Sequence, residues 1–333
     1  MTGWSAPALL LLGIISGPYG LNLLSASVVL LLDPAIAMAL GMLGVFGGLS
    51  FDPRQTQMPQ LVAASAVRTV TAIAAVGAGA LAAMSYWPVG ADLMWVAALM
   101  IGVCAAATNA AADVTIDDVL VIVAGSAIIA VVGAREHGPI VLAVALAGIS
   151  ILVAFAGWLL IGQTASEGEQ HVFVVGSLLL LGGAATYLSL SALAAGLVAG
   201  IVWNLAGDVA RPRIIRDLNY FQHPLVVLLM VAAGASATLS IEAMVLATVF
   251  VAIRALARPA GAWAARHLTD VTSTGERGPS LISAGFVGIA LALDAFRGPG
   301  APQWAAAVLG AVAVGSIVSD TVSVFVPVRA ETR

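Results

Sequence analysis

Residues 139–162 read PIVLAVALAGISILVAFAGWLLIG, and no side chain in this run carries a charge. A helix needs about 20 apolar residues to cross the hydrocarbon core of a bilayer, so this stretch predicts a transmembrane helix. In the whole chain, 61% of the residues are hydrophobic and only 9% are charged. Ordinary soluble domains contain about 25% charged residues. We therefore expect an all-α integral membrane protein, with the lipid bilayer as its partner.

Working outward from residues 139–162, we expect about twelve transmembrane helices in one domain that covers residues 1–333. The first segment is short and ends at Gly17-Pro18. Residues 25–32 are expected to form an interfacial stretch between the first two segments. The twelve segments are 5–18, 34–50, 61–87, 92–109, 117–134, 139–162, 171–188, 190–207, 222–239, 242–264, 279–296 and 303–327.

The arginines predict the orientation of the chain. With both termini in the cytoplasm, only Arg135 and Arg297 fall on the opposite side of the membrane. Such an excess of cytoplasmic arginine follows the positive-inside rule and predicts a multi-pass protein of a bacterial cytoplasmic membrane. A polar linker at 208–221 is expected on the cytoplasmic side, and the net charge of −4 argues against nucleic acid as a partner. The arginines assigned to the cytoplasmic side are Arg54, Arg211, Arg213, Arg216, Arg266, Arg277, Arg329 and Arg333.

The densest polar cluster between apolar runs is residues 108–118, which read TNAAADVTIDD. An ionisable group inside a span costs about 2.5–3.5 kcal/mol on insertion scales, so each one needs a reason. Asp117 and Asp118 would point about 100° apart on a helix. With Thr108 and Asn109 they offer the oxygen ligands that small hard cations prefer. Desolvation and a second nearby anion both favour a protonated carboxyl group, so protons and cations would compete for this pair.

Each of these features has a second interpretation that the residues leave open. Residues 108–118 are also compatible with a solvated turn between two spans. Arg254 and Arg258 share one helix face, and either could extend to the lipid headgroups instead of into the core. Arg68 is expected to mark the cytoplasmic end of its span. Gly285 and Gly288 indicate either a broken helix or close helix packing.

Several motifs, taken in order, resemble the monovalent cation/proton antiporter superfamily, the Na⁺/H⁺ exchanger family with its NapA- and KefB-like members. Asp117-Asp118 is similar to the paired aspartates of that family. The resemblance covers nearly the whole chain. The motifs are 16–21 (SGPYGL), 40–49 (LGMLGVFGGL), 106–109 (AATN), 116–120 (IDDVL), 223–235 (HPLVVLLMVAAGA), 257–262 (ARPAGA) and 283–290 (SAGFVGIA).

This resemblance implies an inverted-repeat antiporter fold with discontinuous crossing helices. The repeats would cover about 5–162 and 171–327, in a core domain and a dimerisation domain that permits a homodimer. It implies exchange of Na⁺ or K⁺ for protons by alternating access, with no cofactor besides the transported ions.

The resemblance also assigns residue roles. Asp118 would be the principal carrier, and Asp117 would be the second acid, with Arg258 as its basic partner. The second crossing helix would carry Gly285, Phe286 and Gly288.

Three departures from the family pattern bear on function. Arg258 replaces a lysine and cannot release its proton, and Phe286 replaces an acid. Only seven residues separate Asn109 from Asp117, where family members have a longer segment. We expect a re-entrant hairpin with the aspartates near the midplane, which is tolerable only along a cavity. If both spans were instead complete, the pair would lie at the surface.

Two other function classes compete with exchange. A membrane scaffold or sensor could keep the antiporter fold without transporting an ion. An intramembrane enzyme is not expected, because the sequence contains neither HExxH nor GxSxG, nor another nucleophile with a base.

Overall fold

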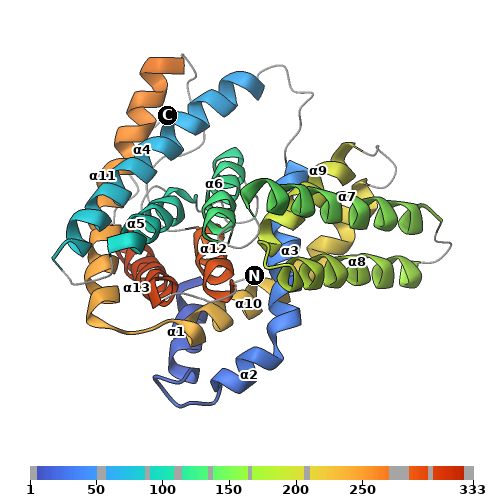
Figure 1. The fold of residues 1–333 in the computed structure, drawn as a ribbon, viewed down its shortest axis with the longest axis horizontal. Coiled ribbons are helices and arrows are strands. Elements are labelled where there is room, and N and C mark those ends of the chain that lie inside the picture. The colour runs from blue at the N-terminus through green and yellow to red at the C-terminus, as the bar shows by residue number, and fades with distance from the viewer. Residues whose placement is uncertain are drawn as a thin grey trace.

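The computed structural model describes residues 6–50, 58–86, 91–108, 115–133, 138–163, 167–205, 211–269, 285–298 and 303–325. Within these ranges all regular secondary structure is helical, which confirms the all-α class (Figure 1). The helices are α1 (Ala6–Ser16), α2 (Ala26–Leu31), α3 (Asp33–Ser50), α4 (Met58–Met84), α5 (Ala91–Ala106), α6 (Ile116–Gly133), α7 (Pro139–Gln163), α8 (Glu167–Tyr187), α9 (Ala192–Leu205), α10 (Arg211–Ser236), α11 (Ile241–Thr269), α12 (Phe286–Arg297) and α13 (Gln303–Phe325).

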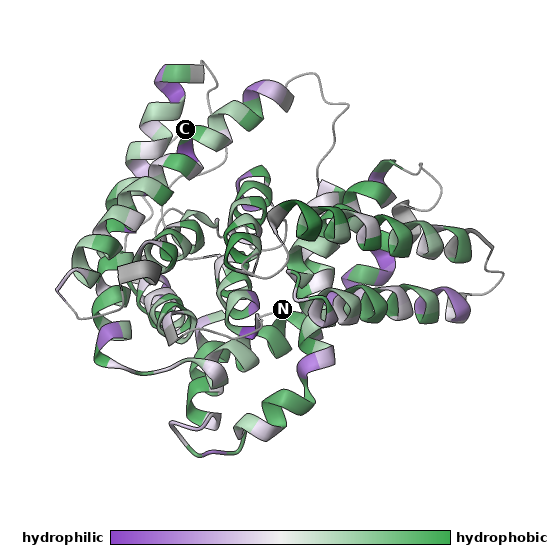
Figure 2. Ribbon diagram, in the orientation of Figure 1, coloured by the Kyte–Doolittle hydropathy of each residue, from purple (hydrophilic) through white to green (hydrophobic). Residues whose placement is uncertain are grey.

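Many helices have the length and the composition of membrane spans. Apolar residues cover most helices on all sides, and hydrophilic residues lie mainly near helix ends (Figure 2). The short helix α2 falls within the predicted interfacial stretch and exposes Leu30 and Leu31. Seven helical stretches are long and apolar enough to cross a membrane: Asp33–Ser50, Pro59–Met84, Ile116–Gly133, Ile140–Leu160, Gly168–Tyr187, Ile214–Ser236 and Trp304–Val322. Shorter apolar helices are Ala6–Ser16, Met94–Ala106 and Ala192–Leu205.

The helices form two groups that meet along α6, α12 and α13 (Figure 1). The first group comprises α4, α5, α6, α11, α12 and α13, with α11 packed along α4 and α13. The second group comprises α1, α3, α7, α8, α9 and α10, in which α9 packs along α3 and α10 packs along α1. Helices α6 and α12 belong to the first group but also contact α3 and α9 of the second. This boundary is called the seam below.

Glycines set the close contact between α3 and α9. A Cβ atom on Gly44 would overlap the carbonyl oxygen of Leu193, and one on Gly196 would overlap that of Gly41. Gly48 and Gly200 face the opposite backbone in the same way. Small residues four apart let two membrane helices approach closely, which compensates for the lack of a hydrophobic driving force between apolar helices in lipid.

The predicted linker at 208–221 is largely helix, because α10 begins at Arg211. Ile214 and Leu218 lie one turn apart and are fully buried. Asp217 is also fully buried, and its Oδ2 accepts a hydrogen bond of 2.8 Å from Gln170 Nε2 of α8. The arginine-rich composition suggested a solvated linker, but the apolar face of this segment packs as the first half of a long helix.

We expect Gly196→Ala to lower the unfolding temperature of the purified protein, because an added methyl group forces α9 away from α3. Overpacking of this kind costs about 1–3 kcal/mol. The matched control is Gly148→Ala in α7, where a Cβ atom would meet nothing within 4 Å. Thermal unfolding in detergent measures both variants, and equal unfolding temperatures would contradict the close contact.

Candidate ion-binding site

The end of α5 and the start of α12 meet inside the first helix group. Helix α5 ends at Ala106, and α12 begins at Phe286 after an extended Gly285 with φ −72° and ψ 148°. A Cβ atom on Gly285 would overlap the carbonyl oxygen of Thr108, and one on Gly288 would lie 2.5 Å from that of Cys104. The two glycines therefore permit the backbones to touch, and the two helix ends leave N–H and C=O groups inside the protein.

Two arginines of α11 satisfy the carbonyl end of α5. Arg258 Nη1 donates to the carbonyl oxygen of Ala106 at 2.8 Å, and Arg254 Nη2 donates to that of Ala107 at 2.9 Å. Arg254 Nη1 also donates to the carbonyl oxygen of Ala105. The C-terminal end of a helix carries partial negative charge, which a nearby cation stabilises. Both arginines are buried, so the alternative in which they extend to the headgroups is wrong.

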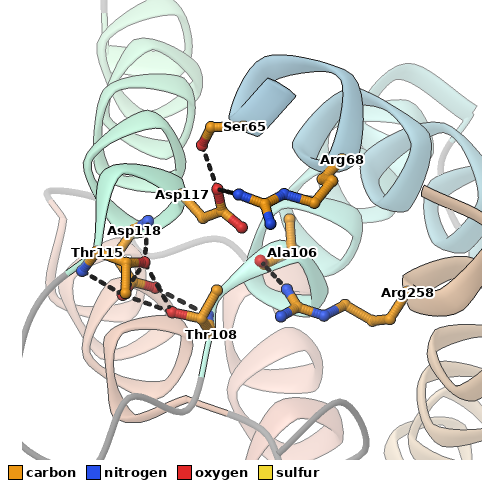
Figure 3. Close-up of polar contacts among 8 residues, drawn as sticks. All are labelled: Ser65, Arg68, Ala106, Thr108, Thr115, Asp117, Asp118 and Arg258. Atoms are coloured by element: carbon orange, nitrogen blue, oxygen red, sulfur yellow. Dashed lines mark hydrogen bonds and ion pairs between the residues drawn. The ribbon is translucent and has the colours of Figure 1, made fainter. Parts of the chain in front are cut away.

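Asp118 lies in the first turn of α6, and its side chain connects the end of α5 with the start of α6 (Figure 3). Its Oδ1 accepts from the backbone N–H of Thr108 at 2.8 Å. Its Oδ2 accepts from Thr108 Oγ1 at 2.7 Å, from Thr115 Oγ1 at 2.9 Å and from the backbone N–H of Thr115 at 3.0 Å. Thr115 and Asp118 thus form a capping box with aspartate in place of the usual glutamate, and the helix N-terminus favours the ionised carboxylate.

The oxygens around Asp118 form a compact set that could hold a small cation. Thr108 Oγ1 and Thr115 Oγ1 are 2.9 Å apart, so the two hydroxyls and the carboxylate are mutually within hydrogen-bond distance. Hard cations prefer such carboxylate and hydroxyl ligands. A bound cation would replace the hydroxyl hydrogen bonds to Asp118, because those hydrogens occupy the space between the oxygens. Asp118 is 2% exposed, which leaves few competing water ligands.

Asp117 is held differently, by a positive charge from α4. Arg68 Nη2 lies 2.9 Å from Asp117 Oδ1, and Ser65 Oγ donates to the same oxygen (Figure 3). Arg258 was expected to pair with Asp117, but its hydrogen bond goes to Ala106. Arg68 was expected at the end of a span, yet it lies within α4, ten residues after Met58. Arg68 is therefore the basic partner of Asp117 among the described residues.

The remaining predicted site residues divide between the site and its surroundings. Asn109 lies outside the described residues. Gly285, Phe286 and Gly288 lie at the start of α12, and their assignment to a second crossing helix stays a prediction. Both aspartates are buried, so the alternative in which the pair lies at the protein surface is wrong.

Three polar side chains of this region were not singled out as site residues from the sequence: Thr115, Ser65 and Arg68. The pattern Thr115-x-x-Asp118 is a recognisable capping signal. Ser65 and Arg68 are three residues apart and so share a helix face, which also could have marked them as a pair. Their connection to Asp117 depends on how α4 packs against α6, and that is set by the tertiary structure.

Comparisons with known proteins bear on the fold. No known family profile matches the sequence, and no curated protein matches it. Among solved structures, the chain is similar to the sodium proton antiporter MjNhaP1 from Methanocaldococcus jannaschii at pH 8, with 16% sequence identity and a TM-score of 0.59. The match covers 96% of this chain and 89% of that protein. The likeness confirms the antiporter fold that the motifs predict.

We expect Arg68→Gln to destabilise the protein, because it leaves the buried charge of Asp117 without its partner. Breaking a buried pair by removing one member costs about 3–5 kcal/mol. Thermal unfolding of the purified protein measures the loss. The double variant Arg68→Gln/Asp117→Asn removes both charges and should recover much of the stability, and the exposed Arg266→Gln is the control. A double variant no more stable than Arg68→Gln would contradict the ion pair.

Proposed function

We propose that this chain is a secondary active transporter that exchanges Na⁺ or K⁺ for protons across a membrane. The observation that carries the proposal is Asp118, a buried carboxylate that lies among hydroxyl oxygens between the end of α5 and the start of α6. Interrupted helices at such a position are a recurrent means of building ion sites in transporters. The similarity to MjNhaP1, which is a sodium proton antiporter, supports the same function.

The proposed mechanism uses the two aspartates for different tasks. Asp117 is paired with Arg68, whose guanidinium does not deprotonate. Asp118 is held by threonine hydroxyls and backbone N–H groups, which are neutral donors. A proton or a metal cation can therefore neutralise Asp118 in turn, and the two compete because each displaces the other. Competition at one carboxylate couples the flux of one ion to that of the other.

We further propose that α4, α5 and α6 correspond to α11, α12 and α13 as inverted repeats within about twelve spans. In each set the middle helix is the shortest, and the end of α5 meets the start of α12 at Thr108 and Gly285. The repeats would then extend over about 5–162 and 171–327. In alternating access, the first helix group would move along the seam relative to the second, which could also form the contact of a homodimer.

A non-transporting scaffold or sensor would be favoured if the aspartates were hydrated at the edge of the protein. Asp117 is 3% exposed and Asp118 is 2% exposed, so this condition is not met.

We expect Asp118→Asn to abolish exchange, because the amide can neither bind a proton at this position nor neutralise a cation. Proteoliposomes with an imposed pH gradient measure this as the dissipation of the gradient on addition of NaCl or KCl. Glu242→Gln is the matched control, since Glu242 is exposed at the start of α11. Full exchange by Asp118→Asn would overturn the role of Asp118, and wild-type vesicles without exchange would overturn the proposed function.

We expect Thr108→Val to raise the cation concentration for half-maximal exchange about tenfold, since a hydrogen bond or ligand to a charged group contributes about 1.5–3 kcal/mol. The maximal rate should change less, because Asp118 is still present. Thr248→Val is the control, because the Thr248 hydroxyl bonds its own helix at Met244. An unchanged half-maximal concentration would exclude Thr108 as a ligand.

A further inference from the structure

A second buried carboxylate, that of Asp294 on α12, lies at the seam and takes no part in the site around Asp118. Ser191 Oγ donates to Asp294 Oδ2 at 2.5 Å. The backbone N–H groups of Ala192 and Leu193, at the start of α9, lie near the Asp294 carboxylate. Ser191 Oγ is in turn 3.1 Å from Ser126 Oγ of α6. Ser191 Oγ accepts from the backbone N–H of Ala194 and so caps α9, and Asp294 is bonded to this capping residue of a helix in the other group.

The cluster of Asp294, Ser191 and Ser126 is separate from the Asp118 site. Asp294 is eight residues from Phe286 on α12, and Ser126 is eight residues from Asp118 on α6. At 1.5 Å per residue, each interval is about 12 Å along its helix. Apolar packing lies between the levels, where Leu291 of α12 lies against Gly125 of α6. The cluster therefore forms a second polar level at the seam.

A small cavity adjoins this cluster. Its volume is about 20 Å³, and a cavity needs roughly 10–15 Å³ to hold one water molecule. Polar groups line it, as a bound water molecule requires. The lining includes Thr186, Ser189, Ser191, Asp294 and Arg297. A water molecule here could exchange a proton with the Asp294 carboxyl group.

The charges that face Asp294 are few among the described residues. Arg297 lies one turn further along α12, and its guanidinium is engaged with Asp33 of α3, with Nη2 2.7 Å from Asp33 Oδ1. The other polar side chains beside Asp294 are uncharged: Ser191, which immediately precedes α9, and Ser126 of α6. The ionised carboxylate is thus stabilised by donors and by the start of α9, and these contacts weaken when the carboxyl group is neutral.

From this geometry we infer that Asp294, with Ser191 and Ser126, is a second proton-binding site, whose ionised form joins α12 to α9 and whose protonated form loosens the seam. The inference rests on the proposed function for its role in exchange, because movement along the seam would separate Asp294 from Ser191. The binding of the proton itself can be tested without transport.

Infrared difference spectra of the purified protein in lipid, recorded during a pH titration, detect protonated carboxyl groups directly. Among the carboxyl bands that appear on acidification, we expect one to be missing in Asp294→Asn. In Ser191→Ala the midpoint of that band should move about one unit to higher pH, because the ionised form has lost a donor. Ser126→Ala should move it less, since Ser126 acts through Ser191. Asp118→Asn is the control and should leave the band in place.

Hydrogen–deuterium exchange at one fixed pH tests the effect on the seam. The peptide that covers the start of α9 should exchange faster in Asp294→Asn and in Ser191→Ala than in the wild type. An unchanged set of carboxyl bands in Asp294→Asn, or an unchanged midpoint of the Asp294 band in Ser191→Ala, would overturn the inference. If Asp294 titrates as expected while wild-type vesicles show no exchange, the proposed function fails and the proton site stands.

Discussion

The structure depends on the pairing of backbone polar groups at helix ends that lie inside an apolar protein. An N–H or C=O group without a partner costs several kcal/mol where water is absent, so an interrupted helix survives only if side chains replace the missing bonds. At the end of α5 these side chains are Arg254 and Arg258, which donate to consecutive carbonyl groups. At the start of α6 they are Thr115 and Asp118. Charged residues that would be costly elsewhere in a span are here required by the backbone.

The same arrangement gives the two neighbouring aspartates different properties. Arg254 and Arg258 are partly neutralised by the negative end of α5, and Arg68 is neutralised by Asp117. Asp118 lies among neutral donors at the positive end of α6, so its charge is stabilised by dipoles. Dipoles can reorient or separate when a cation or proton arrives, whereas an arginine keeps its full charge. The difference between adjacent carboxylates thus follows from which helix each one faces.

The sequence was sufficient for the features that depend on composition and local pattern. Apolar runs predict the helices, and the residues around Asp118 and Gly285 predict where two of them are interrupted. Contacts between distant helices were not accessible in this way. Arg68 and Arg258 are both arginines within apolar segments, and only the packing of α4 against α6 brings Arg68 to Asp117. The segment 208–221 was predicted to be a polar linker because it contains three arginines. Ile214 and Leu218, which are spaced one helical turn apart, instead bury one face of it. Asp294 escaped notice because it lies near the predicted end of a span, where an acid is ordinary.

Helices α6 and α12 carry acids at two levels and also lie at the seam, so the proposed ion binding and the proposed movement involve the same two helices. Asp118 is bonded within the first helix group, to Thr108 beside α5 and to Thr115 at the start of α6. Asp294 is bonded across the seam, to the start of α9. Neutralising Asp118 would weaken its hydrogen bonds to Thr108 and Thr115 within the first helix group. Neutralising Asp294 would weaken the hydrogen bond from Ser191 that joins the two helix groups. In the proposed movement, the first helix group would carry Asp118 together with Thr108 and Thr115, so the bonds of that site would be kept. The same movement would separate Asp294 from Ser191, so the two carboxylates would act at different steps because only one of them is bonded across the seam.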